Sequence, residues 1–215
     1  MVTSVPPRSR SNPLALAVLA CLFERPMHPY EMAQTLRSRA KHESIRLNYG
    51  SLYGVVEGLE RRELIHPLET TRQGRRPQRT VYEITEAGKV EMNEWLSELV
   101  AVPVKEYLQY EAALSMLHGL PPDEATPLLR QRCEALELQL DQIEARFQGA
   151  EKRGLPRLFM IEDEYQLALL RAELEFTRTL VADIESGAMP GVDDWRSWFE
   201  RGGAADPTDD TTGDD

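Results

Sequence analysis

The chain has 215 residues, of which 41% are hydrophobic, enough for one or two ordinary cores; this excludes a long repeat protein or a fully disordered chain. Its net charge of −11 argues against a protein that coats itself in nucleic acid or anionic lipid. The charge is uneven, because residues 1–100 carry +2 and residues 101–215 carry −13. The acidic excess therefore belongs to the second half.

Two cysteines, Cys21 and Cys133, lie far apart within apolar helical patterns, so we expect neither a disulfide framework nor a cysteine metal site. The longest apolar run, residues 14–23, is short of the roughly eighteen residues that a membrane helix needs. The basic start of the chain lacks a plausible signal-peptide cleavage site. These features predict a cytoplasmic protein with no membrane partner.

Three short helices are predicted first. Asn12 and Pro13 are typical of an N-cap and a first helical position, and predict a helix to about Glu24. A second helix begins near Pro29 and a third follows Asn48. The third helix places apolar residues at i, i+3, i+4 and i+7, namely Leu52, Val55, Val56 and Leu59.

Residues 65–71 and 79–84 are rich in Thr, Val, Tyr and Ile, and the polar stretch between them predicts a β-hairpin with an extended tip. Thr85 is a good N-cap for a further helix. Three helices, a hairpin and another helix are the layout of a winged helix-turn-helix domain. We assign this domain to residues 12–100 and a flexible N-terminus to residues 1–11.

The second half is predicted to be helical throughout, so the fold class is mostly α with one small hairpin. One helix is expected over residues 103–117. The next begins at either Pro122 or Pro127, because both are good first helical positions, and ends before Gly154. The last is expected over residues 159–186.

Both long helices carry a heptad seam of apolar residues, typical of a coiled coil. The last helix also has Leu169, Phe176 and Leu180 outside its seam, and so much apolar surface needs more than one neighbour. An antiparallel hairpin within the chain is one solution; a second copy of the chain also buries the wider stripe and is preferred. Residues 101–187 are therefore assigned to homodimerisation, through Leu129, Cys133, Leu136, Leu140, Ile143, Phe147, Leu167, Leu170, Leu174, Val181 and Ile184.

Residues 188–215 combine an aromatic segment with a Gly- and Asp-rich tail that is predicted to be disordered. The aromatic residues of this segment, with others at the domain junction, could line an apolar pocket for a planar effector. The alternative is that they only clip a terminal segment onto the core. The candidate pocket residues are Trp95, Tyr107, Trp195 and Trp198.

Motifs of enzymes are missing from the sequence. The four histidines have no ligand spacing, and there is no phosphate-binding glycine loop, nucleophile elbow or zinc motif. The acidic runs 162–164 and 193–194 are typical of solvated faces. We therefore expect no catalytic activity, no metal and no cofactor.

The predicted hairpin tip is the most basic part of the chain. Between Thr70 and Tyr82 it has four arginines and no acid, in a protein that is otherwise acidic. A phosphate backbone or a narrow minor groove supplies the anion that such a loop lacks. The alternative is pairing with Glu69, Glu83 or other nearby acids. The arginines are Arg72, Arg75, Arg76 and Arg79.

The start of the third helix is predicted to supply the other half of a DNA contact. Its first turn presents hydroxyl and amide groups on the side opposite the apolar face. Such groups can form hydrogen bonds with base edges and phosphates. Tyr53 is the ambiguous member, because it could equally be a core residue. Cations at the end of the second helix suit phosphate binding. The candidate residues are Asn48, Tyr49, Ser51 and Tyr53, with Arg37, Arg39 and Lys41.

Residues 13–88 closely resemble the PadR family of bacterial transcriptional regulators. The resemblance is carried by PMHPYEM at 26–32, GSLY at 50–53, LERRELI at 59–65 and YEITEAG at 82–88. It implies a dimeric repressor, or less often an activator, that binds an inverted-repeat operator and is sometimes released by a small aromatic compound. Pro29 and Glu63 stand where many relatives have glycine, so the turn geometry at these two positions is open.

The function predicted from the sequence is therefore a homodimeric, sequence-specific DNA-binding regulator of transcription. Its partners are double-stranded operator DNA, a second copy of the chain and a small-molecule effector. The alternative is a dimeric adaptor whose winged domain docks an acidic protein and does not bind DNA.

Overall fold

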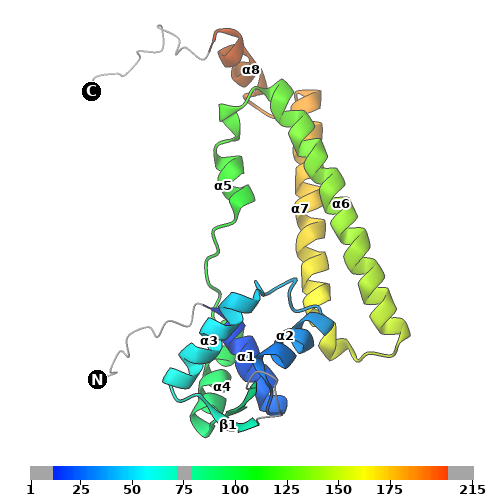
Figure 1. The fold of residues 1–215 in the computed structure, drawn as a ribbon. Coiled ribbons are helices and arrows are strands. Elements are labelled where there is room, and N and C mark those ends of the chain that lie inside the picture. Colours follow the sequence, from blue (N-terminus) through cyan, green and yellow to red (C-terminus); the bar gives the residue numbers. More distant parts are fainter. Residues whose placement is uncertain (1–11, 72–78, 203–215) are drawn as a thin grey trace, which may run out of the picture. The chain divides into compact units, whose positions relative to one another are not determined.

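The structure is a computed structural model that describes residues 12–71 and 79–202. The chain divides into two units, residues 1–106 and 107–215. The described residues are mostly helical with one two-stranded antiparallel sheet, which confirms the predicted fold class (Figure 1). Residues 1–11 and 203–215, predicted to be flexible or disordered, lie outside the described residues.

The described residues of the N-terminal unit form four helices and the two strands of the hairpin, in the predicted order. Asn12 Oδ1 accepts a hydrogen bond from the N–H of Leu14 at 3.1 Å, and Thr85 Oγ1 accepts one from the N–H of Gly88 at 3.0 Å. These caps begin two helices at the predicted positions. The elements are α1 (Pro13–Glu24), α2 (Pro29–Ser38), α3 (Tyr49–Arg61), β1 (Ile65–Thr71), β2 (Arg79–Ile84) and α4 (Glu86–Ala101).

One hydrophobic core holds this unit together. Leu52, Val56 and Leu59 of α3 are fully buried, as their helical spacing predicts. They pack with buried residues of α1 and α2 and with Ile65 and Ile84, which pair across the two strands. Because the hairpin is rooted in the same core as α3, the two predicted DNA-contacting elements have fixed bases.

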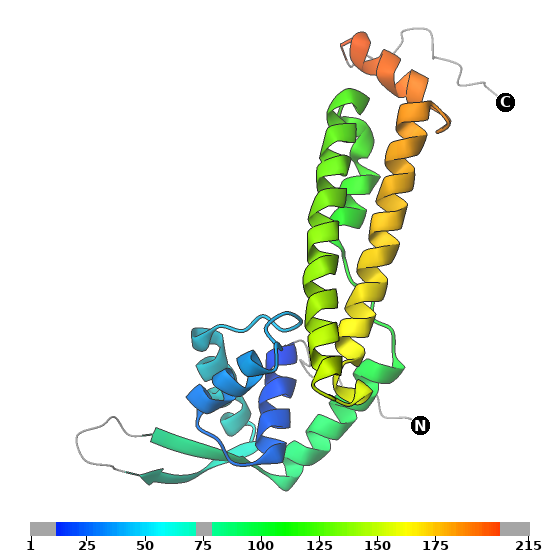
Figure 2. The same ribbon diagram turned by 90° about the vertical axis from the view of Figure 1, so that its right-hand side faces the viewer.

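The hairpin projects from the helices as a two-stranded wing (Figure 2). Its pairing shifts by one residue between Pro67 and Glu69, which marks a β-bulge. Met27, in the link between α1 and α2, pairs with Tyr82 of β2 through two backbone hydrogen bonds of 3.1 and 3.0 Å. The base of the wing is therefore tied to the first half of the helical unit.

The structure shows the geometry of both turns that the sequence left open. Pro29 occupies the first position of α2, where a missing N–H costs nothing. Glu63 adopts the left-handed backbone conformation, with φ of 57°, and ends α3 in a Schellman motif: its own N–H reaches Glu60 O at 2.8 Å, and that of Leu64 reaches Leu59 O at 3.0 Å. The chain thus keeps the turn that glycine would make, although a side chain is strained there.

Replacing Glu63 with glycine is expected to stabilise the protein by about 0.5–1 kcal/mol, because it relieves the strain of a left-handed residue. Urea unfolding of the full chain followed by circular dichroism measures the change. Glu57→Gly is the matched control, since it removes the same charge from an exposed position inside α3 and should cost about 1 kcal/mol. Equal effects of the two variants would contradict the strain at Glu63.

The C-terminal unit is helical, but its first helix is shorter than predicted. A helix was expected over residues 103–117, whereas α5 starts only at Gln109. Val102 has an extended backbone, as an N-cap residue would, but its side chain has no acceptor for the first N–H groups of a helix, and residues 103–108 are not helical. The elements are α5 (Gln109–Ser115), a 3₁₀ turn (Leu117–Gly119), α6 (Pro122–Lys152), a 3₁₀ turn (Arg157–Phe159), α7 (Ile161–Ser186) and α8 (Val192–Glu200).

The two long helices, α6 and α7, lie side by side as an antiparallel hairpin (Figures 1 and 2). Of the two starts left open for α6, the structure has Pro122, and Pro127 lies inside the helix. Cross-helix ion pairs accompany the packing, such as Arg146 with Asp163 at 2.6 Å. Ion pairs of this kind on an accessible surface contribute little, so the stability of the hairpin comes from its seam.

The heptad residues assigned to homodimerisation form this intrachain seam, which corrects their assignment. Heptad spacing specifies a helical partner but not the chain that supplies it. Cys133, Leu136, Leu140, Leu167 and Leu174 make one buried cluster, with Ile143 and Leu170 packed against it. Leu129, Val181 and Ile184 belong to a second, and Phe147 lies half-buried beside Leu167. These side chains are used within one chain and are not a free dimer surface.

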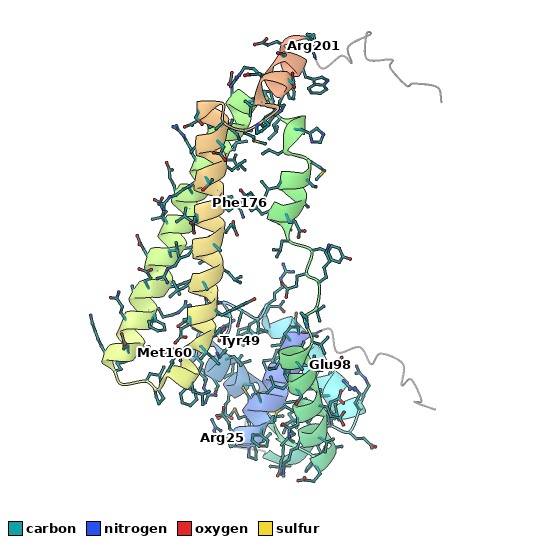
Figure 3. The ribbon with its side chains drawn as sticks, turned by 180° about the vertical axis from the view of Figure 1, so that it is seen from behind. Arg25, Tyr49, Glu98, Met160, Phe176 and Arg201 are labelled. Atoms are coloured by element: carbon teal, nitrogen blue, oxygen red, sulfur yellow. The ribbon has the colours of Figure 1, made fainter. Side chains whose placement is uncertain are left out.

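A second apolar stripe on α7 has no partner within the described residues of this unit. Ile161, Tyr165, Leu169 and Phe176 share one side of the helix, and each is more than half exposed. Phe176 lies on the side of α7 away from α6 (Figure 3). We call these four residues the outer stripe of α7. It contains two of the three residues that widened the predicted apolar face, while the third, Leu180, packs partly against the second cluster.

Candidate nucleic-acid interface

The first turn of α3 exposes the predicted polar set. Asn48 caps the helix, its Oδ1 accepting a hydrogen bond from the N–H of Ser51 at 2.7 Å. Tyr49 and Tyr53 are 38% and 44% exposed and Ser51 is also exposed, so the alternative of a core Tyr53 is wrong. The cap uses the acceptor oxygen of Asn48 and leaves its amide nitrogen for other contacts. Tyr49 is at the N-terminal end of α3 (Figure 3).

Three glycines leave part of the exposed side of α3 without side chains. Gly50, Gly54 and Gly58 have no positive φ, and a Cβ at any of them would find no atom closer than 3.7 Å. Glycine inside a helix costs roughly 1 kcal/mol relative to alanine. The fold therefore does not need these glycines, and without Cβ atoms at these positions another surface can come close to the helix backbone.

The two arginines predicted as phosphate contacts at the end of α2 differ in their partners. Arg39 makes a two-pronged ion pair with Glu24 at the end of α1, and its Nη2 lies 2.7 Å from Glu24 Oε2. This hydrogen-bonded guanidinium lowers the pKa of Glu24 below its usual value. Arg39 is therefore neutralised within the unit, whereas Arg37 contacts the uncharged Tyr49.

Arg46 is a cation that the sequence interpretation missed. It lies in the loop before α3, where Ile45 and Leu47 pack against the core while Arg46 itself is exposed. No carboxylate of the described chain pairs with it. The alternation of apolar and basic residues over 45–47 was the signal that could have identified it. Lys41, the third predicted cation, is half-buried in the same loop.

The predicted basic tip of the wing falls largely in the gap between the described ranges. Arg72, Arg75 and Arg76 lie outside the described residues, and Arg79 is the first residue of β2. The described base of the wing carries Tyr82, whose hydroxyl lies 3.3 Å from Glu60 Oε2. Burial raises the pKa of Tyr82, and the nearby Glu60 carboxylate raises it further, so the phenol keeps its proton.

The residues proposed for an effector pocket have separate structural roles. Trp95 is buried in the N-terminal unit, and its Nε1 has no hydrogen-bond partner in the described chain. Tyr107 is 88% exposed, and Trp198 makes an edge contact with Phe199 in α8. Trp195 Nε1 donates to Leu120 O at 2.9 Å and so holds α8 in place. This contact supports the alternative that Trp195 holds the terminal segment onto the core.

The described residues contain no cluster of three or more His, Cys, Asp or Glu side chains that could hold a metal ion. Both cysteines are buried thiols, and burial raises the pKa of Cys21 to about 11, so this thiol stays protonated at neutral pH. Among the described helices, none combines the length and the apolar character that crossing a membrane requires.

Comparison with solved structures finds the same fold in transcriptional regulators. Bacillus subtilis PadR in complex with operator DNA has a TM-score of 0.65 at 16% identity, with 80% of this chain and 98% of that chain covered. The same protein with p-coumaric acid gives 0.63 at 14% identity, covering 85% and 99%. The Vibrio cholerae virulence activator AphA gives 0.52 at 15% identity, covering 87% and 98%.

Sequence comparison supports the same grouping for the first unit. The chain has no match among curated proteins. Residues 18–94 match the family described as the transcriptional regulator PadR-like family, and this range extends from α1 through the wing into α4. The family and the fold are those of transcriptional regulators. Residues 18–94 thus form a winged-helix domain of the PadR-like family, and the chain carries a longer helical region after it.

Proposed function

We propose that the protein is a dimeric, sequence-specific transcriptional regulator, acting as a repressor, that binds an inverted-repeat operator through α3 and the wing. The observation that carries the proposal is the outward side of the first turn of α3. Tyr49, Ser51 and Tyr53 are exposed there beside glycines that the fold does not need. Exposed hydroxyl groups on a thin helix suit the base edges and phosphates of a major groove.

Charge supports the same surface. Arg37 and Arg46 flank the start of α3, and within the described residues neither is paired with a carboxylate. In an acidic protein, cations left without acids are a cost unless a partner supplies negative charge. The four arginines of the wing extend this surface in the proposal, because a duplex offers phosphates on both sides of the groove that α3 would enter.

The dimer contact is assigned to the outer stripe of α7. One winged domain covers little DNA, and helix-turn-helix proteins usually bind two half-sites through a two-fold dimer. A second copy of the chain is the occupant proposed here, because an isologous contact covers the same apolar stripe on both copies at once. The acidic C-terminal unit would then keep DNA away from all but the reading surfaces.

We also propose that a small aromatic effector releases the protein from its operator. Bacillus subtilis PadR has been crystallised with p-coumaric acid, a planar aromatic ligand. In this chain, the buried Nε1 of Trp95 is a donor without a partner in the described structure, and a ligand oxygen would satisfy it. An effector acts only if it favours one arrangement of the winged domains over another.

The test measures binding to random-sequence duplex DNA by fluorescence anisotropy as salt is raised. Each lost phosphate contact lowers the slope of log affinity against log salt by about 0.9. Arg75→Ala together with Arg76→Ala should therefore weaken binding to all sequences and reduce the slope by about two. Arg157→Ala with Arg171→Ala is the matched control, because it removes the same charge from exposed positions in the other unit.

Two outcomes would contradict the proposal in different ways. If the wing variant binds with an unchanged slope, the wing does not contact phosphate. If the wild-type protein shows no salt-dependent binding to any duplex, it is not a DNA-binding protein, and the adaptor alternative gains support. Selection of bound sequences from a random pool then gives the operator and the spacing of its half-sites.

A further inference from the structure

The exposed stripe of α2 that faces the start of α3 is a built side-chain cluster. Tyr30, Gln34 and Arg37 stand at i, i+4 and i+7, and all three are exposed. Gln34 Nε2 donates to the hydroxyl of Tyr30 at 3.1 Å. The ring of Tyr30 stacks on that of Tyr49, with 6.2 Å between the ring centroids and 10° between the planes.

Arg37 is held against Tyr49 in two ways. Its Nη1 donates to the Tyr49 hydroxyl at 2.6 Å, and its Cζ lies 4.5 Å from the centre of the Tyr49 ring. A guanidinium has five N–H donors, so four remain for another acceptor. Because Tyr49 is neutral, the positive charge of Arg37 is oriented but not cancelled. Arg39, two residues away, has its charge cancelled by Glu24.

We propose that Tyr49 is a positioning residue that holds the Arg37 guanidinium ready for a DNA phosphate. The ring of Tyr30 stacks on that of Tyr49 and limits its movement. This inference rests on the proposed DNA-binding function and changes the role predicted for Tyr49. The hydroxyl that was expected to read a base edge accepts a hydrogen bond from Arg37 instead. Arg37 is the phosphate contact of α2, and Arg39 links α1 to α2.

The physical gain is preorganisation. A free exposed arginine samples many rotamers, and ordering it on DNA costs conformational entropy. An arginine already held by a hydroxyl and a ring face has given up part of that freedom in the folded protein. A phosphate bound by such a group gains a planar, multi-donor partner at the edge of the groove. The pair therefore acts as one unit.

A double-mutant cycle on the full chain tests this unit, using the duplex that the wild-type protein selects from a random pool. Arg37→Ala should lower the salt slope by about one. Tyr49→Phe keeps the ring stacked on Tyr30 and removes only the hydroxyl, so it should weaken binding about three- to tenfold without changing the preferred sequence. In the Arg37→Ala background, Tyr49→Phe should have no further effect.

Arg39→Ala and Ser51→Ala are the controls. Arg39→Ala removes one positive charge close to Arg37 and should leave the salt slope at its wild-type value, because a guanidinium held by Glu24 does not contact a phosphate in this proposal. Ser51→Ala should change sequence preference if α3 reads bases. Circular dichroism of each variant separates lost binding from lost fold.

Any result other than these contradicts a specific part of the inference. Independent effects of Arg37→Ala and Tyr49→Phe would show that the two side chains do not act as a unit. A Tyr49→Phe protein that prefers a different base pair would make Tyr49 a base reader. If the wild-type protein binds no duplex in a salt-dependent way, this inference and the proposed function both fail; if it binds and the cycle is additive, only this inference fails.

Discussion

Replacing Gly88 with alanine is expected to destabilise the N-terminal unit by about 3 kcal/mol, at the upper end of the usual cost of overpacking. An added Cβ would lie 2.1 Å from Leu64 O and 2.8 Å from Ile84 Cγ1. The closest clash is with the backbone, so no side-chain rotation relieves it. The φ of Gly88 is not positive, and the cost is therefore steric and not conformational.

The clash is severe because several hydrogen bonds meet at this point. Leu64 O accepts a hydrogen bond from the N–H of Thr85 at 3.0 Å, and Thr85 Oγ1 donates to Glu63 O at 2.9 Å while capping α4. The end of α3, the start of β1 and the start of α4 are thus pinned together around Gly88. Moving α4 outward to admit a methyl group would stretch these bonds and open the core between Leu64 and Ile84.

Urea unfolding of the full chain measures the loss, and hydrogen exchange of peptides from α1 and α3 assigns it to this unit. Gly54→Ala is the matched control. A Cβ there meets nothing within 4 Å, so the same substitution should stabilise α3 by up to about 1 kcal/mol. Similar stability changes for the two variants would contradict the close approach of α4 to Leu64.

Local chemistry made most of the first unit predictable. The caps Asn12 and Thr85 and the apolar spacing of α3 are short-range signals, and each gave a helix at the predicted place. The two strands have the predicted limits because polar turn residues separate two β-prone segments. The error in the start of α5 came from reading Pro103 as a helix start although Val102, the residue before it, has no side-chain acceptor to cap a helix.

Partners across the fold could not be predicted in the same way. The charge of Arg39 is cancelled by Glu24 and the guanidinium of Arg37 is oriented by Tyr49, pairs separated by 15 and 12 residues. No local pattern links such positions. Arg37 and Arg39 therefore look equivalent in the sequence, but they have different partners in the structure.

The seam of α6 and α7 shows the same limit at a larger scale. An apolar heptad face is satisfied equally by a helix of the same chain or of another chain. The α6 and α7 seam residues meet in one chain, so the dimer needs other surface. What distinguishes the outer stripe of α7 is that its exposed apolar side chains lie together on one side of a helix whose other face is buried: Tyr165 is 65% exposed and Leu169 and Phe176 are each 53% exposed.

Replacing Leu169 and Phe176 together with aspartate is expected to convert the protein to a monomer. In an isologous contact each substitution appears on both copies, so two pairs of carboxylates would be brought into one apolar interface. The helices should remain folded, because both side chains are more than half exposed in the single chain. Sedimentation equilibrium measures the mass, and circular dichroism checks the helix content.

The same variant should bind its operator about 10²- to 10⁴-fold more weakly, since the second winged domain no longer benefits from the effective concentration that the first provides. Leu128→Asp with Leu138→Asp is the matched control, because it places the same charges on exposed leucines of α6. A control that also dissociates would move the contact away from the outer stripe. A monomeric Leu169→Asp/Phe176→Asp protein that keeps full operator affinity would show that each winged domain binds DNA alone, and a two-fold operator would then have no physical basis.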